Sequence, residues 1–155
     1  MSVQVELTPR AKSAVTLAVM LAAIMQMLDT TIANVALPHM QGALSATQDQ
    51  LAWVLTSYIV ASAIMTLPVG WLSGRYGRKN VFVISIAGFT LTSLRCGAAS
   101  SLNEMIAFRI LQGLFGAALV PLSQAIMLDI NPKEEHGKAM AMWAVSIMIG
   151  PILGP

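Results

Sequence analysis

The sequence predicts an all-α integral membrane protein with about five transmembrane helices. Of its 155 residues, 56% are hydrophobic and only 10% carry a charge, and the mean hydropathy is +0.72. Soluble domains carry about a quarter charged residues, so this composition indicates that the lipid bilayer covers most of the surface. The apolar segments are continuous rather than alternating, which indicates helices and not the strands of a membrane barrel.

Five apolar segments are candidates for membrane spans. A helix needs about 20 apolar residues to cross a hydrocarbon core of about 30 Å. After a tail of residues 1–13, the spans are expected at about 14–37, 51–73, 81–99, 102–128 and 138–155. We expect Pro38 to end the first helix, and we expect the fifth to be truncated.

Basic residues gather at the segment ends that would share one side of the membrane. They are Arg10, Lys12, Arg75, Arg78, Lys79, Lys133 and Lys138, whereas the other side receives only Arg95, near its margin. Cytoplasmic loops of membrane proteins carry an excess of lysine and arginine. The N-terminus is therefore expected in the cytoplasm.

Several classes of function are excluded by composition and motifs. The net charge of +2 and the clustering of the basic residues do not describe a nucleic-acid binder. The sequence contains no metal-ligand spacing, no nucleophile–base arrangement and no phosphate-binding loop, so we predict no enzyme, no metal site and no cofactor. The single cysteine, Cys96, excludes an internal disulfide.

Asp29 is the most informative residue of the sequence, because no other Asp, Glu, Lys or Arg occurs between Ser13 and Thr47. A charge in hydrocarbon is costly, so Asp29 should face a partner or an aqueous cavity. The helical rise places it about 13 Å from the outer end of its helix, and Arg109 about 7 Å from the outer end of another. A carboxylate near that cation can take up and release a proton. The alternative is a permanent structural ion pair or a hydrogen bond to a neighbouring helix.

Arg109 also begins a helical face that combines polar side chains with glycines. The members of this face are Arg109, Gln112, Gly113, Gly116, Val120 and Ser123. Such a face suits a cavity wall or a close helix contact. Packing alone, with Gln112 bonding across to another helix, is the alternative.

The stretch GWLSGRYGRK, which follows the second segment, combines glycine with positive charge. Gly70 and Gly74 are spaced for the close approach of a neighbouring backbone, and Gly77 permits a tight turn. Arg75 and Arg78 place positive charge just inside the membrane. A basic loop that only sets the topology is the alternative.

The final stretch, SIMIGPILGP, combines small residues with proline. Ser146, Gly150 and Gly154 form a small-residue face that can seal against a partner helix. Pro151 weakens the helix by removing a backbone hydrogen bond, which a purely structural kink also explains. The stretch has no terminal charge or cap, so we expect the chain to be the front part of a longer protein. A complete five-helix protein is the alternative.

Four stretches, in order, resemble motifs of the major facilitator superfamily, and in particular its fourteen-helix drug–proton antiporters of the EmrB/QacA type. LDTTIANVALP resembles the first-helix motif of that branch, and GWLSGRYGRK resembles the loop motif between helices two and three. RILQGLFGAA resembles the fourth-helix motif, and GPILGP resembles the start of the antiporter motif in helix five. The resemblance implies an incomplete N-terminal six-helix bundle of a secondary multidrug transporter, a proton antiporter in the inner or plasma membrane.

The resemblance also implies roles for individual residues. Asp29 would belong to the proton- and cation-responsive site, with Arg109, Gln112 and Gly113 taking part in proton coupling. The implied cytoplasmic gate contains Gly70, Arg75, Gly77 and Arg78. The helix that limits proton leak is implied to be shaped by Gly150, Pro151 and Gly154. The loop motif usually carries an acid where this chain has Gly74, so the turn is implied here but the charge relay of the gate is not.

The implied partners are the lipid bilayer, protons, small lipophilic or cationic substrates, and the remaining C-terminal helices of the same transporter. The resemblance does not say whether a periplasmic adaptor protein is a further partner. Two alternatives stand beside this interpretation. One is a complete small membrane protein with a regulatory or assembly role, and the other is a major facilitator exporter of another substrate class.

Overall fold

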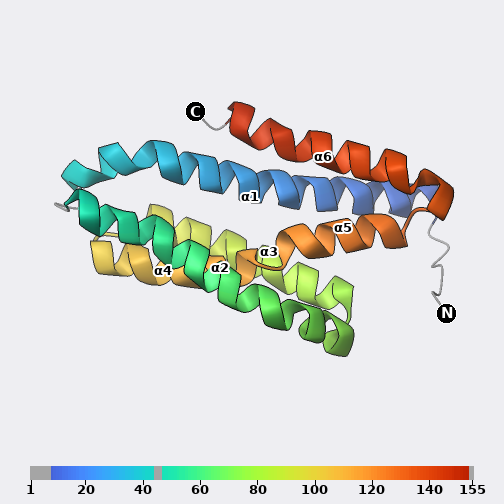
Figure 1. The fold of residues 1–155 in the computed structure, drawn as a ribbon, viewed down its shortest axis with the longest axis horizontal. Helices are drawn as coiled ribbons and strands as arrows, with labels where there is room; N and C mark the ends of the chain where they lie inside the picture. Colours follow the sequence, from blue (N-terminus) through green and yellow to red (C-terminus); the bar gives the residue numbers. More distant parts are fainter. Residues whose placement is uncertain (1–7, 44–46, 154–155) are drawn as a thin grey trace.

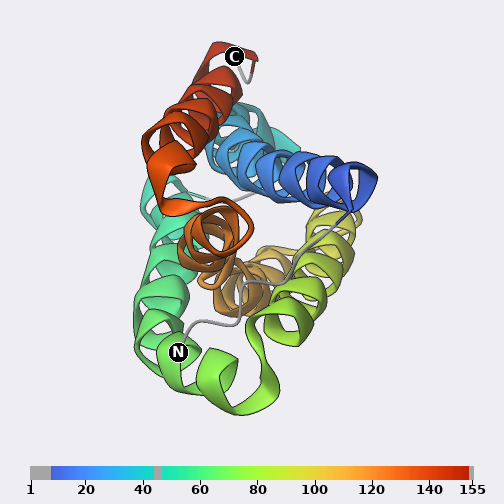
Figure 2. The same cartoon turned by 90° about the vertical axis from the view of Figure 1, so that its right-hand side faces the viewer.

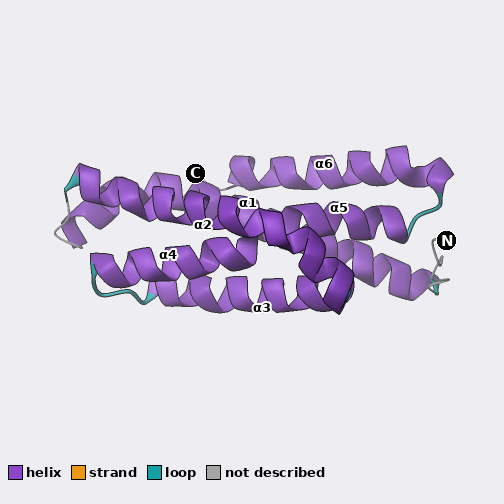
Figure 3. Ribbon diagram, turned by 60° about the horizontal axis from the view of Figure 1, so that its bottom comes forward, coloured by secondary structure: helices purple, strands orange, loops and turns teal. Residues whose placement is uncertain are grey.

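The computed structural model describes residues 8–43 and 47–153, and these are helical apart from short connections (Figure 3). The prediction of an all-α fold is thereby confirmed for these residues. The helices are α1 (Pro9–Ala43), α2 (Gln48–Tyr76), α3 (Arg78–Gly97), α4 (Leu102–Gly116), α5 (Leu119–Asp129) and α6 (His136–Leu153), with a 3₁₀ turn, η1 (Lys133–Glu135), before α6.

Four stretches of the described residues are long and apolar enough to cross a membrane. They are Pro9–Ala36, Gln48–Tyr76, Arg78–Gly97 and Leu102–Asp129. The last of these joins α4 and α5 in one span. α6 is not among the four, so its passage across the membrane stays a prediction.

The helices lie side by side along the length of the molecule (Figure 1). The start of α1, the turn between α2 and α3, and the connection from α5 to α6 share one end. This is the arrangement that the distribution of basic residues predicts. Viewed along the bundle, α5 is enclosed by the other helices (Figure 2) and packs against α1, α3 and α6.

A pair of hydrogen bonds defines where α2 begins, and a glycine defines where α3 begins. The Thr47 hydroxyl accepts from the backbone N–H of Gln50 at 3.3 Å, and the Gln50 side chain accepts from the N–H of Thr47 at 3.0 Å. This reciprocal pair is a capping box that satisfies donors at the start of α2. Gly77 has a φ of +85°, a backbone conformation that favours glycine, and it makes the one-residue connection between α2 and α3.

Pro38 was expected to end the first helix, and this expectation is wrong. Pro38 does not end the first helix, because α1 continues to Ala43. A proline interrupts only one bond of the helical ladder, and the flanking bonds carry the helix past it, as they also do at Pro68 within α2.

The fourth expected segment consists of two helices, with a turn at Ala117 and Ala118 between α4 and α5. Pro121 explains the position of this turn. It has no N–H to donate to the carbonyl of Ala117, and its ring crowds that carbonyl. The ladder resumes at once on the far side, where Leu122 donates to the carbonyl of Ala118 at 3.0 Å.

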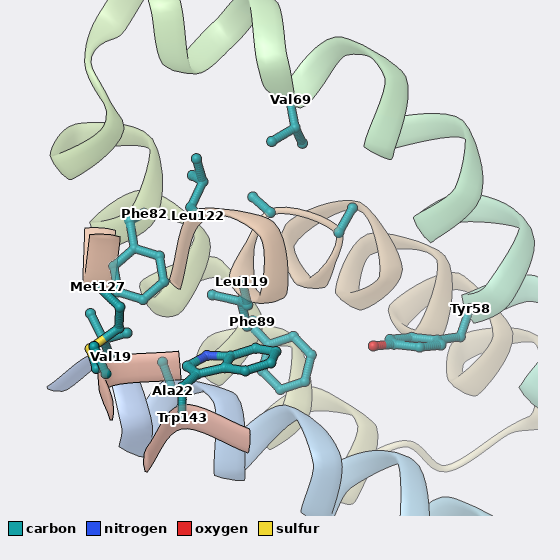
Figure 4. Packing of buried hydrophobic residues seen from close by; sticks show 13 residues of the cluster. Val19, Ala22, Tyr58, Val69, Phe82, Phe89, Leu119, Leu122, Met127 and Trp143 are labelled. Carbon is teal, nitrogen blue, oxygen red and sulfur yellow. The ribbon is translucent and has the colours of Figure 1, made fainter. Parts of the chain in front are cut away.

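The apolar core lies where the helices converge on α5 (Figure 4). Phe89 and Leu119 are fully buried at its centre. Trp143 of α6 enters this core, and its indole N–H donates to the hydroxyl of Ser123 at 2.9 Å. Conversely, large apolar side chains such as Leu67 and Leu94 are exposed on the outside, as expected for a surface that lipid covers.

α6 approaches α1 closely at Gly150. A Cβ atom added there would lie 2.5 Å from the Cβ of Met27 and 3.2 Å from the backbone nitrogen of Leu28. Because one of these neighbours is backbone, a larger residue at position 150 requires the two helices to separate.

Replacing Gly150 with alanine should therefore lower the free energy of unfolding by about 1–3 kcal/mol, since it overpacks a tight helix contact. Thermal unfolding of the protein in detergent measures the effect. Gly137→Ala, in the same helix, is the matched control, because a Cβ there meets no atom within 4 Å. A Gly150→Ala variant as stable as this control would contradict the contact.

Candidate functional site

Asp29 of α1 and Arg109 of α4 form an ion pair inside the bundle. Arg109 Nη1 lies 2.8 Å from Asp29 Oδ2, and the two side chains are 4% and 17% exposed, respectively. Of the three ion pairs among the described residues, this is the only one with both partners mostly buried. The structure thus brings together the two intramembrane charges that the sequence singled out.

Gln112, one turn beyond Arg109 on α4, completes a closed triangle. Its Nε2 donates to Asp29 Oδ1 at 2.8 Å, and its Oε1 accepts from Arg109 Nη1 at 2.8 Å. The side chain is fully buried. Gln112 therefore satisfies both charges at once, which fixes the geometry of the pair and lowers the cost of burying it.

α3 contributes two groups that sequence reasoning missed. The hydroxyl of Ser93 donates to Asp29 Oδ1 at 3.4 Å, and the thiol of Cys96 lies 3.6 Å from Gln112 Oε1. Serine and cysteine are common in membrane helices, so no sequence pattern distinguishes them. Only the packing of α3 against α4 brings them to the site.

α2 supplies the remaining partners of Arg109. The guanidinium Nε donates to the backbone carbonyl of Val54 at 3.4 Å. The Cζ atom lies 4.5 Å from the centroid of the Tyr58 ring, a distance at which a cation is attracted to the face of the ring. Arg109 is thus held by three other helices, α1, α2 and, through the Gln112–Cys96 contact, α3.

Gly113 explains how α4 comes so close to α2. A Cβ at this position would lie 2.5 Å from the backbone carbonyl oxygen of Tyr58 and 3.0 Å from the Cβ of Ala61. The absence of a side chain lets the α4 backbone pack directly on α2. Gly113 therefore supports the site by placing Arg109 and Gln112, and not by contacting Asp29.

Two clefts reach the ion pair. One, of about 230 Å³, is lined by Asp29, Ser93, Cys96 and Arg109 together with apolar residues of α1, α2 and α4. The other, of about 440 Å³, runs between α1 and α3, and its lining includes Asp29, Ser93 and Phe89. Asp29 lines both clefts, whereas Arg109 lines the smaller one alone.

The loop predicted as a gate lies at the opposite end of the bundle. Arg78 forms an ion pair with Asp129, at the end of α5, and both side chains are about half exposed. Asp129 was not anticipated from the sequence. The guanidinium of Arg75 lies 5.7 Å from the centroid of the Trp71 ring. A Cβ added at Gly70 or Gly74 would meet no atom within 4 Å, so the close helix approach expected on this face of α2 is not made by the described helices.

The structure describes some, but not all, of the residues predicted to shape the last helix. Gly150 packs on α1, and Ser146, one turn earlier, is also buried. The backbone of Pro151 lies within α6, and Gly154 lies outside the described residues. Within the described part of the chain, no cluster of three His, Cys, Asp or Glu residues could hold a metal ion.

Comparison with known proteins gives a family match and several relatives. The sequence profile of the Major Facilitator Superfamily matches residues 19–155. The chain is 45% identical over 140 residues to the multidrug export protein EmrB of Haemophilus influenzae. It is 43% identical over 141 residues to the fatty acid resistance protein FarB of Neisseria gonorrhoeae. These alignments cover 90% and 91% of this chain but only 28% of each relative.

A solved structure has a similar fold. It is a bacterial homologue of the human lysosomal transporter Spinster, in an inward-facing and unoccupied conformation. The TM-score is 0.84 at 20% sequence identity, and the match covers 95% of this chain and 31% of that chain. At this identity the likeness shows the fold alone.

The buried ion pair predicts a strong energetic coupling between Asp29 and Arg109. Replacing either residue with alanine leaves the other charge buried without its partner, so each change should lower the free energy of unfolding by about 3–5 kcal/mol. The double variant should lose clearly less than the sum of the two, as measured by thermal unfolding in detergent. Additive losses would show that the two side chains do not interact.

The Arg78–Asp129 pair is the matched control for this cycle. Its side chains are 50% and 53% exposed. Because water screens such pairs, its coupling should be at most about 1 kcal/mol.

Proposed function

The chain belongs to the major facilitator superfamily, and we propose that it is the N-terminal part of a proton-coupled multidrug exporter. Members of the family are transporters and not enzymes. The chain spans 28% of the length of the relatives named above. Activity would therefore reside in the whole transporter, whose remaining helices would supply the second wall of an alternating-access pathway.

The buried pair of Asp29 and Arg109 carries this proposal. A carboxylate that is mostly buried in a membrane-spanning bundle, yet lines two clefts, is suited to exchanging a proton with water. In its charged form it binds Arg109 or a cationic ligand. When it takes up a proton, it loses its negative charge and its hold on either cation.

Proton and substrate would thus compete for one carboxylate. A lipophilic cation that enters the site is attracted by ionised Asp29, and a proton arriving from outside the cell displaces it. Gln112 bridges Asp29 and Arg109 and would transmit the loss of charge to α4. Gly113 would keep α4 packed on α2 while Asp29 gains or loses its proton.

The orientation in the membrane is part of the proposal. The start of α1, the α2–α3 turn and the α5–α6 connection lie at one end and carry most of the basic residues (Figure 1). The positive-inside rule supports a cytoplasmic location for this end, in the inner or plasma membrane. Asp29 and Arg109 would then lie nearer the outside, where protons enter.

The basic end would contain the cytoplasmic gate, formed by Gly70, Gly74, Arg75, Gly77 and Arg78. Gly77 makes the turn, and Arg78 pairs with Asp129. Since Gly74 occupies the position of the usual acid, Asp129 supplies the carboxylate that Arg78 contacts among the described residues. Gly150, Pro151 and Gly154 would shape the helix that seals the pathway against proton leak, and the close contact of Gly150 with α1 supports this role.

A second candidate is export of lipophilic acids, which the similarity to FarB favours. In that case Arg109 would attract the anionic substrate, and protonation of Asp29 would free it to do so. Transport of a cationic dye and of a fatty acid, measured in parallel with the same protein, separates the two candidates.

Asp29→Asn should abolish proton-driven efflux of cationic dyes from vesicles that contain the full-length transporter, because the side chain no longer binds and releases a proton. The variant should still fold, since asparagine keeps an oxygen that can accept from Arg109. Fluorescence of the dye under an imposed pH gradient measures efflux. Undiminished efflux of every cationic dye tested would contradict the assigned role.

Asp49→Asn is the matched control for this experiment. Asp49 is an exposed carboxylate in the first turn of α2. Its loss should leave the efflux rate within about twofold of the wild-type rate, since exposed charges at helix ends contribute little.

Arg78→Ala should lower the maximal efflux rate severalfold but leave the pH at which efflux is half-maximal unchanged, because the gate lies at the other end of the bundle from Asp29. Asp129→Ala should reproduce this effect. Lys79→Ala, which removes a neighbouring charge that forms no ion pair with the described residues, is the control. A shift of the pH profile in the Arg78 variant would contradict a role restricted to the gate.

A further inference from the structure

We propose that Tyr58 is a positioning residue of the proton site, whose ring holds the Arg109 guanidinium when Asp29 takes up a proton. This inference rests on the proposed function, because it concerns the same exchange of protons. Tyr58 lies on α2, away from the stretches that resemble family motifs. Nothing in the sequence singled it out.

The arrangement of the two side chains supports this role. The Arg109 Cζ atom lies 4.5 Å from the centroid of the Tyr58 ring. Tyr58 and Arg109 are only 6% and 3% exposed. The face of an aromatic ring carries partial negative charge, and its attraction for a cation is stronger where water is excluded. In addition, Arg109 Nη2 has no hydrogen-bond partner among the described residues.

The ring is held in place from several sides. The Gln26 side chain donates through Nε2 to the Tyr58 hydroxyl at 3.4 Å. A Cβ added at Gly116 would lie 3.1 Å from that hydroxyl, so α4 has room for it only because residue 116 is glycine. Figure 4 shows the ring pointing from α2 into the interior of the bundle.

The contacts of Arg109 indicate what protonation of Asp29 would change. While Asp29 is ionised, its charge balances the guanidinium at 2.8 Å. Once it is protonated, the partners that remain are Gln112 Oε1 at 2.8 Å, the Val54 carbonyl at 3.4 Å and the ring. A buried charge without a counter-charge is costly. Once Asp29 is neutral, the guanidinium would move closer to the ring, and this stronger contact would reduce the cost and make protonation of Asp29 easier.

The other groups around Asp29 do not replace the ring. α4 presents Arg109 and the neutral Gln112, α3 presents the Ser93 hydroxyl and the Cys96 thiol, and α2 presents Tyr58. Among the described residues, α5 and α6 contribute no hydrogen bond or ion pair to Asp29. Gln112 Oε1 and the Val54 carbonyl stay beside Arg109 as neutral acceptors after protonation, and the ring adds its negative face to them.

The test is the pH dependence of dye efflux by the full-length transporter in vesicles, compared for the wild type, Tyr58→Phe and Tyr58→Leu. We expect Tyr58→Leu to move the half-maximal pH by about one unit toward acid, because protonation of Asp29 loses the help of the ring. Tyr58→Phe keeps the ring and should keep the wild-type midpoint. Phe82→Leu, a loss of another buried aromatic ring, should leave the midpoint unchanged.

A graded series removes any dependence on how well the leucine variant folds. Phenylalanines with one, two or three ring fluorines, incorporated at position 58, keep the shape of the ring and progressively weaken its negative face. The midpoint should move further toward acid with each fluorine. A midpoint that is independent of fluorination would overturn the inference, whatever the leucine variant does.

Asp29→Asn in the same assay separates this inference from the proposed function. If that variant still couples efflux to protons, the proposed function fails and the Tyr58 role fails with it. If Asp29→Asn abolishes coupling but the fluorinated series keeps one midpoint, only the role of Tyr58 is overturned.

Discussion

The structure depends on one electrostatic constraint, which is that two opposite charges buried in a membrane-spanning bundle need each other as partners while both are charged. Removing a carboxylate and a guanidinium from water costs several kcal/mol each, and their attraction repays this only with close geometry and further hydrogen bonds. The 2.8 Å contact between Asp29 and Arg109, and the bridging amide of Gln112, meet both conditions. A proton on Asp29 disturbs this balance, so a change of one charge can favour a different packing of the helices.

Small residues and one proline allow the helices to meet this constraint. Gly113 lets α4 pack on α2, where Val54 and Tyr58 contact Arg109, and Gly150 lets α6 pack on α1. The interruption before Pro121 separates α4, which carries the polar site, from α5, which enters the apolar core. The span formed by α4 and α5 thus contributes to both the polar site and the apolar core, because its ladder of backbone hydrogen bonds is interrupted between the two helices.

The fold class, the two charges and the importance of Gln112 could be predicted from the sequence, because a charge or an amide in an apolar helix is costly without a partner, but the bridge that Gln112 makes between the charges could not. Asp29, Arg109 and Gln112 can therefore be identified from the sequence alone. Tyr58 and Ser93 do not, because an aromatic ring or a hydroxyl is common in membrane helices and gains its role only from the helix opposite. Pro38 shows the limit of a local rule, since α1 continues past it. Asp129 was missed because its partner, Arg78, is 51 residues away in the sequence, and only the fold brings the two together.

The proposed function requires that Asp29 change its charge when substrate and proton exchange. Infrared difference spectroscopy of the full-length transporter in lipid tests it directly, since a protonated carboxyl has a carbonyl band distinct from that of a carboxylate. Acidification should produce a carboxyl band that is absent in Asp29→Asn, and a saturating cationic dye at the same pH should remove it. A spectrum in which no band depends on Asp29, or in which the Asp29 band does not respond to any transported compound, would contradict the account.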